Sequence, residues 1–232
     1  MGEAVQVWQV PLRVSDETVT RYTQCLSEDE VSRADRFRFT ADRRKFVVAR
    51  GTLRHLLGAR LGCAAGAIAF CYSRYGKPEM SASSSSDCHC HFNLSHSGEM
   101  ALCALSGARI VGIDIEKIKP IQRLENMLER CLVAREKAIV KSHAMEQQPL
   151  AFLQHWTCKE AYLKAIGLGL SQSMTTIEVD LDSPQFVHVP DGCAASWQLH
   201  KIAVPEAYVA ALVVAGEATV EVSCWQHRQE LP

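Results

Sequence analysis

The chain has 232 residues, of which 47 % are hydrophobic and 22 % charged, so it can bury the core of one large domain or two small ones and is not disordered in composition. Its formal net charge of -1 does not suggest general binding to nucleic acid, and no apolar run has the length of a membrane span. The N-terminus lacks the pattern of a signal peptide, so we expect a cytoplasmic protein with reduced cysteine thiols.

The first half of the chain predicts a strand, two helices and then short strands. Residues 5–14 alternate in hydropathy, which predicts a strand. Ser27 and Glu30 have the spacing of a capping box and begin a helical pattern over residues 27–39. A second helix is predicted from residue 40 or 41 to about 61. Further strands are expected near residues 68–73, 90–94, 99–105 and 109–115.

The second half repeats this order of helix and strand. A helical pattern covers residues 121–168 with a break near 147–149, and residues 175–214 are rich in strand formers. Residues 100–105 (MALCAL) also resemble residues 208–213 (YVAALV). We therefore predict an α+β fold, a pseudo-dimer of two similar subdomains with the active site in the cleft between them. The predicted subdomains are residues 1–106 and 107–232.

Two acidic residues end the strand predicted near residues 109–115. Alternation places Asp114 and Glu116 on one face, together with Gly112, whose lack of a side chain leaves room for a ligand. Two neighbouring carboxylates repel each other, and a hard cation such as Mg²⁺ relieves that repulsion. The alternative is a strand end that reaches solvent, and this alternative is favoured when the two acids are considered alone.

The segment 156–164 predicts a helix that places charges in and beside an apolar stripe. The stripe is formed by Phe152, Trp156, Leu163 and Ile166. Lys159 lies within it and needs an anion, either a protein carboxylate or a bound phosphate. Glu160 and Lys164 lie beside the stripe. They can act in a site or form an ordinary i,i+4 salt bridge.

Polar and basic residues offer further contacts for an anion. A polar turn is expected where Ser95 and His96 follow a strand, and it suits either phosphate binding or a simple capped turn. Arginines recur along the two early helices, on one side if those helices are continuous: Arg36, Arg43, Arg50 and Arg54. The serine-rich stretch 81–87 is expected to be a flexible loop. The Cys/His run 88–91 lacks the spacing of a zinc site.

Four segments in this order resemble the Sfp-type 4′-phosphopantetheinyl transferases. They are RYGKP at 74–78, FNLSHS at 92–97, GIDIE at 112–116 and WTCKEAYLK at 156–164. The resemblance spans roughly residues 30–215. It implies an enzyme that transfers the phosphopantetheine arm of coenzyme A to a serine of an apo acyl or peptidyl carrier protein and releases adenosine 3′,5′-bisphosphate. It also implies Mg²⁺ as cofactor, coenzyme A as co-substrate and a monomer.

The resemblance assigns roles to individual positions. Those that match the family's Mg²⁺ ligands are Asp114, Glu116 and Glu160. Those that match its lysines near the pyrophosphate are Lys159 and Lys164. Those that match contacts to the 3′-phosphate region are Lys77, Ser95 and His96. Those in the family's basic coenzyme A-binding region are Arg33, Arg36 and Arg50. Glu160 and Lys164 are the predicted catalytic pair, and Glu136 is an alternative base.

Two other functions fit the same residues. A Mg²⁺-dependent nucleotide phosphohydrolase also needs carboxylates and a lysine. A non-catalytic coenzyme A-binding module needs the basic residues but gives the carboxylates no role. For the transferase, an acidic carrier protein needs a local basic surface, and we expect it after the metal-binding strand, at Lys117, Lys119, Arg123 and Arg130.

Overall fold

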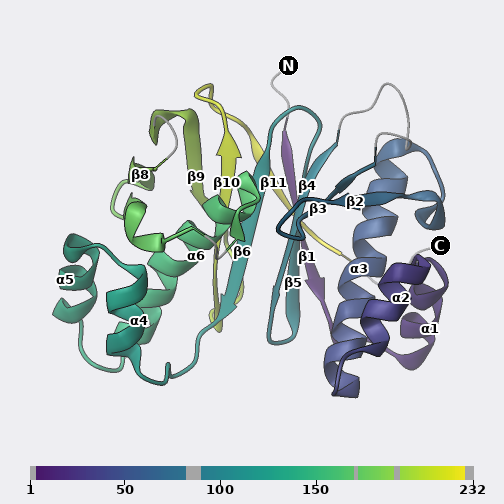
Figure 1. The fold of residues 1–232 in the computed structure, drawn as a ribbon, viewed down its shortest axis with the longest axis horizontal. Helices are drawn as coiled ribbons and strands as arrows, with labels where there is room; N and C mark the ends of the chain where they lie inside the picture. Colours follow the sequence, from purple (N-terminus) through teal and green to yellow (C-terminus); the bar gives the residue numbers. More distant parts are fainter. Residues whose placement is uncertain (1–3, 82–89, 170–171, 191–193, 228–232) are drawn as a thin grey trace.

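The computed structural model describes residues 4–81, 90–169, 172–190 and 194–227 (Figure 1). The helices and strands of the first half are β1 (Val5–Pro11), α1 (Asp16–Gln24), α2 (Glu28–Asp35), α3 (Thr40–Leu61), β2 (Phe70–Tyr72), β3 (Pro78–Met80), β4 (His91–Ser97) and β5 (Met100–Ser106). Those of the second half are β6 (Val111–Lys117), α4 (Leu124–Cys131), α5 (Ala134–Ser142), α6 (Gln148–Ile166), β7 (Glu178–Asp180), β8 (Gln185–His188), β9 (Trp197–Lys201), β10 (Tyr208–Ala215) and β11 (Val222–Gln226).

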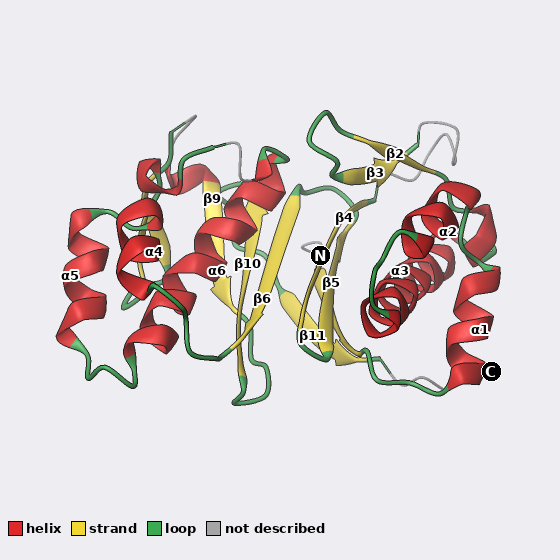
Figure 2. Cartoon of the chain, turned by 60° about the horizontal axis from the view of Figure 1, so that its bottom comes forward, coloured by secondary structure: helices red, strands yellow, loops and turns green. Residues whose placement is uncertain are grey.

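Two antiparallel motifs of the same design form the centre of the molecule. In the first sheet, β5 pairs with β1 and β4, and in the second, β10 pairs with β6 and β9. The two sheets lie in the middle, with α3 outside the first and α6 outside the second (Figure 1; Figure 2). The predicted α+β pseudo-dimer is confirmed, and the similarity of MALCAL to YVAALV marks the equivalent strands β5 and β10.

Three apolar clusters hold these layers together. One lies between α3 and the first sheet, and another lies between the second sheet and α4, α5 and α6. The third joins the two sheets, with Val7 and Leu102 on one side and Ile113 and Leu212 on the other. All four of these side chains are fully buried, so the halves share one interior and do not pack as separate domains.

Several expectations need correction. The strand predicted over residues 5–14 ends at Pro11, and helix α1 follows, capped by the Ser15 hydroxyl, which accepts from the Thr18 N–H. The polar turn expected at Ser95 and His96 is instead part of strand β4, because β5 pairs with it as far as Ser97. Finally, β11 returns from the second half to pair with β1 in the first sheet.

Other expectations concern helix continuity, the Cys/His run and membrane spans. Helices α2 and α3 are separate, so the arginine spacing from residue 36 to 54 does not define one shared side.

Residues 82–89, with most of the serine-rich stretch and the first half of the Cys/His run, lie outside the described residues. Cys90 is buried and His91 begins β4. None of the described helices combines the length and apolarity needed to cross a membrane.

Candidate active site

Gly112 determines how closely helix α6 approaches strand β6. A Cβ atom at this position would lie 2.0 Å from the Ala161 carbonyl oxygen and 2.4 Å from the Ala165 nitrogen. The expectation that Gly112 leaves room for a ligand is therefore wrong, because the space is filled by the backbone of α6. This close packing sets Glu160 and Lys164 of α6 beside the acidic end of β6.

Asp114, Lys164 and Ser95 form a compact polar group at the junction of the two halves. The Lys164 ammonium lies 2.6 Å from Asp114 Oδ1 and 2.7 Å from Ser95 Oγ, and the serine hydroxyl donates to the same Asp114 oxygen at 2.8 Å. Asp114 is 3 % exposed, and burial raises its pKa against the opposing effects of Lys164 and Ser95. The predicted residues from β4, β6 and α6 are thus brought together.

Glu116 and Glu160 add two carboxylates to this group. Glu116 accepts a 2.7 Å hydrogen bond from the Ser97 hydroxyl, and burial raises its pKa. Burial and the nearby Asp114 carboxylate raise the pKa of Glu160 to about 7. Each carboxyl group therefore resists ionisation, chiefly because it is removed from water, and for Glu116 and Glu160 also because Asp114 is near.

These carboxylates suit a small cation. Asp114 Oδ2 and Glu160 Oε1 are both buried and lack a hydrogen-bond partner. Oxygen-only donors of this kind match the preference of Mg²⁺, and a cation would relieve the raised pKa values. Within the described residues, no three acidic, His or Cys side chains are already arranged to hold a metal ion. In the structure, the positive charge next to Asp114 is the Lys164 ammonium.

Lys159 belongs to a different, interior cluster. Its fully buried ammonium donates to Glu136 Oε2 at 2.5 Å and to the carbonyl oxygens of Cys131 and Met174. The anion required by the apolar stripe is thus a protein carboxylate. Glu136 is also fully buried and accepts from the Val133 and Val179 N–H groups. Lys159 and Glu136 fix α6 to its neighbours and are not grouped with Asp114.

Lys77 also contacts the protein itself. It lies in the RYGKP turn between β2 and β3, and its ammonium donates to the Ala165 carbonyl oxygen at 2.8 Å. This carbonyl is in the last turn of α6, where a positive charge stabilises the helix. Burial lowers the pKa of Lys77. The residue therefore links the first half of the chain to the end of the helix that carries Glu160 and Lys164.

His96 has a positively charged environment. Its side chain keeps solvent exposure, yet desolvation lowers its pKa, and so do the ammonium groups of Lys164 and Lys45 and the guanidinium of Arg33. The Asp42 carboxylate opposes this effect, but the three cationic groups outnumber it and favour a bound anion there. Lys45 also forms a 2.8 Å ion pair with Glu99, which moderates this charge.

The three predicted arginines have different surroundings. Arg33 and Arg36 are exposed at the end of α2, and Arg33 stacks on Phe46. Arg50 is 4 % exposed and lies 3.4 Å from Glu30, and burial lowers its pKa. Its Nε and Nη1 atoms are buried and lack hydrogen-bond partners. Glu30 is shared with Arg54, which donates to it at 2.6 Å.

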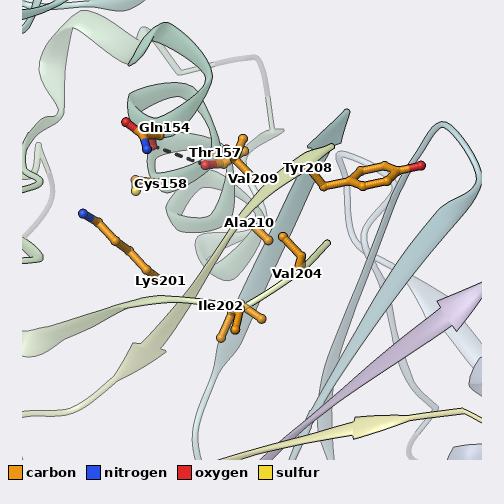
Figure 3. Close-up of a pocket in the computed structure, with 10 residues that line it drawn as sticks. Gln154, Thr157, Cys158, Lys201, Ile202, Val204, Tyr208, Val209 and Ala210 are labelled. Carbon is orange, nitrogen blue, oxygen red and sulfur yellow. Dashed lines mark hydrogen bonds between the residues drawn. The ribbon is translucent and has the colours of Figure 1, made fainter. Parts of the chain in front are cut away.

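A cavity of about 210 Å³ lies between the middle of α6, the end of β9 with the residues that follow it, and the start of β10 (Figure 3). Thr157 and Cys158 of α6 face Lys201 and Val209 across it. None of the predicted site residues lines this cavity. It is therefore separate from the cluster formed by Asp114, Glu116, Glu160 and Lys164.

Sequence reasoning missed two members of the group, Asn93 and Ser97. The Asn93 side-chain oxygen accepts from the Ile113 N–H at 2.9 Å, and the Ser97 oxygen accepts from the Lys117 N–H at 3.1 Å. A signal was available, because polar residues 93, 95 and 97 alternate along a segment that was expected to end in a turn.

Comparisons with known proteins agree on one class of enzyme. The family described as 4′-phosphopantetheinyl transferase superfamily matches residues 110–213, and the family 4′-phosphopantetheinyl transferase, N-terminal, matches residues 11–107. The chain is 37 % identical to the 4′-phosphopantetheinyl transferase HetI of Nostoc sp., over 93 % of this chain and 90 % of that protein.

Two further similarities were found. A putative 4′-phosphopantetheinyl transferase of Synechocystis sp. is 30 % identical, over 84 % of this chain and 78 % of that protein. The crystal structure of a holo-(acyl-carrier-protein) synthase from Bacillus anthracis in complex with CoA (3′,5′-ADP) superimposes with a TM-score of 0.40 at 25 % identity, over 47 % of this chain and 98 % of that one.

Proposed function

Because the chain belongs to the 4′-phosphopantetheinyl transferase superfamily, we propose that it transfers the phosphopantetheine arm of coenzyme A to a serine of an apo acyl or peptidyl carrier protein. The by-product is adenosine 3′,5′-bisphosphate. The observation that supports this proposal is the convergence of Asp114 and Glu116 from β6 with Glu160 and Lys164 from α6.

The residues proposed to hold Mg²⁺ are Asp114, Glu116 and Glu160. When bound there, Mg²⁺ would supply positive charge that offsets the negative charge of the coenzyme A pyrophosphate during transfer. Lys164 supplies a second positive charge beside the same carboxylates. The exposed His96, with three cationic groups nearby, is proposed to face the 3′-phosphate region, as are the exposed Arg33 and Arg36.

Glu160 is proposed as the group that accepts the proton of the carrier serine. The Glu160 Oε1 atom is buried and lacks a hydrogen-bond partner, so it is available to accept a proton. The alternative base, Glu136, is fully buried, and both of its oxygens accept hydrogen bonds. Glu136 therefore supports the fold, and Lys159, its partner, acts with it.

A mass measurement separates the three candidate functions. The protein is mixed with coenzyme A, Mg²⁺ and an apo carrier protein, and the carrier is then weighed. The transferase adds the mass of one phosphopantetheine group to the carrier. A phosphohydrolase releases phosphate without a carrier, and a binding module retains coenzyme A with no product. No mass gain with several carrier proteins contradicts the proposal.

The carrier is expected to bind at an exposed basic surface that follows β6. Lys117, Lys119, Arg123 and Arg130 are all exposed there. We predict that Lys119→Glu raises the KM for an acidic carrier severalfold and leaves the KM for coenzyme A unchanged, because charges at the rim of an interface mainly affect association. Steady-state kinetics at two salt concentrations measures both values. Arg13→Glu, at another exposed position, is the control, and an equal effect in both variants contradicts the prediction.

The cytoplasmic location and the monomeric state are further proposals. The monomer is supported by the two halves, which already bury a common core within one chain. Light scattering of the purified protein tests it directly.

A further inference from the structure

Strand β6 is the edge strand of its sheet. It pairs with β10 on one side only. The N–H groups of successive residues in a strand point to opposite edges, so the groups on the unpaired edge recur at every second residue. Such buried N–H groups need acceptors, and an unpaired edge is otherwise a site for unwanted strand addition.

Strand β4, from the other half of the molecule, supplies acceptors through its side chains. β4 is the edge strand of the first sheet and lies beside β6 (Figure 2). The N–H groups of Ile113, Ile115 and Lys117 donate to the side-chain oxygens of residues 93, 95 and 97 at 2.9, 3.4 and 3.1 Å. A ladder of side-chain oxygens thus replaces the backbone ladder between the two sheets.

The two serines of this ladder have a second task. Ser95 accepts from the Ile115 N–H and donates to Asp114, and Ser97 accepts from the Lys117 N–H and donates to Glu116. The same arrangement therefore repeats every two residues. Each hydroxyl accepts from a backbone N–H of β6 and donates to the carboxylate of the residue just before that N–H in the chain.

We propose that Ser97 is a positioning residue that holds the Glu116 carboxylate ready for Mg²⁺, across the junction of the two halves. This inference rests on the proposed function, in which Glu116 is a metal ligand. Groups that orient the ligands of a metal commonly change its affinity by about 10–100-fold when they are removed. Ser97 is a cleaner test than Ser95, because the Ser95 hydroxyl also contacts the predicted catalytic Lys164.

The experiment compares Mg²⁺ binding to the parent protein and to Ser97→Ala. Calorimetric titration of Mg²⁺ into protein saturated with coenzyme A, without carrier, gives the dissociation constant, which we expect to rise about tenfold in the variant. In the transfer assay, Ser97→Ala needs more Mg²⁺ for half-maximal rate but keeps its kcat at saturating Mg²⁺. Ser97→Thr retains the hydroxyl and restores the parent affinity.

Ser106→Ala is the matched control. The Ser106 hydroxyl accepts from the Arg109 N–H at 3.1 Å, the same distance as in Ser97, but directs no carboxylate. Unchanged Mg²⁺ affinity in Ser97→Ala, or an equal loss in Ser106→Ala, overturns the inference. If the proposed function itself is wrong, the result is different, because the parent protein then transfers no phosphopantetheine to any carrier.

Discussion

Glu160→Gln is expected to lower the rate of phosphopantetheine transfer by about 10³-fold, within the range that a positioned acid or base contributes. The substitution keeps the size of the side chain but removes its charge and its ability to accept the serine proton. It also replaces one of the three proposed Mg²⁺ ligands, a carboxylate, with a neutral amide oxygen. The transfer assay with a carrier protein measures the effect at saturating coenzyme A and Mg²⁺.

The same substitution is expected to stabilise the metal-free protein. The Glu160 pKa is about 7 in the folded state, because burial and then Asp114 oppose ionisation, against 4.5 as its ordinary value. Between these values the folded state binds more protons than the unfolded state, so the free energy of unfolding falls as the pH rises. The loss is complete above pH 7 and amounts to about 3 kcal/mol, which a glutamine does not incur.

Denaturant unfolding in EDTA at several pH values between 5 and 8 tests this effect. We expect the advantage of Glu160→Gln to increase with pH and to shrink when Mg²⁺ is added to the parent protein. Glu206→Gln, at an exposed position, should follow the parent at every pH. An active Glu160→Gln enzyme, or a constant stability difference across this range, contradicts the role assigned to Glu160.

The sequence predicted structure well where a short local pattern is enough to identify a helix, a strand or a family motif. Capping-box spacing located α2, in which the Ser27 N–H donates to Glu30, and hydropathy located α3, α6 and most strands. Four ordered motifs indicated the family and the group of Asp114, Glu160 and Lys164. The comparisons confirm the family, and the structure brings these three residues together.

Other features depend on contacts between segments that are distant along the chain. Helix α1 is short, and β11 is an exposed edge strand whose partner is β1, more than two hundred residues earlier. The partner of Lys159 is Glu136, on another helix. No local pattern distinguishes that carboxylate from a phosphate. The ladder from β4 to β6 likewise requires the two halves to be placed side by side.

Gly112→Ala is expected to destabilise the protein by about 3 kcal/mol or more, at the upper end of the effects of overpacking. The new methyl group meets the α6 backbone at Ala161 and Ala165, where no flexible side chain can move aside. Helix α6 must therefore shift away from β6. Because Glu160 and Lys164 are on this helix, the 2.6 Å contact from Lys164 to Asp114 is lost with it, and transfer activity falls even at temperatures where the variant stays folded.

Gly66→Ala separates this contact from the general effect of replacing a glycine. A Cβ atom at Gly66 would meet no atom within 4 Å, and its φ angle is not in the left-handed region, so its stability should stay within about 0.5 kcal/mol of the parent. Thermal unfolding and the transfer assay are measured on both variants. If Gly112→Ala matches Gly66→Ala in both, then α6 tolerates displacement from β6. The close packing of these two elements then does not determine the geometry of the site.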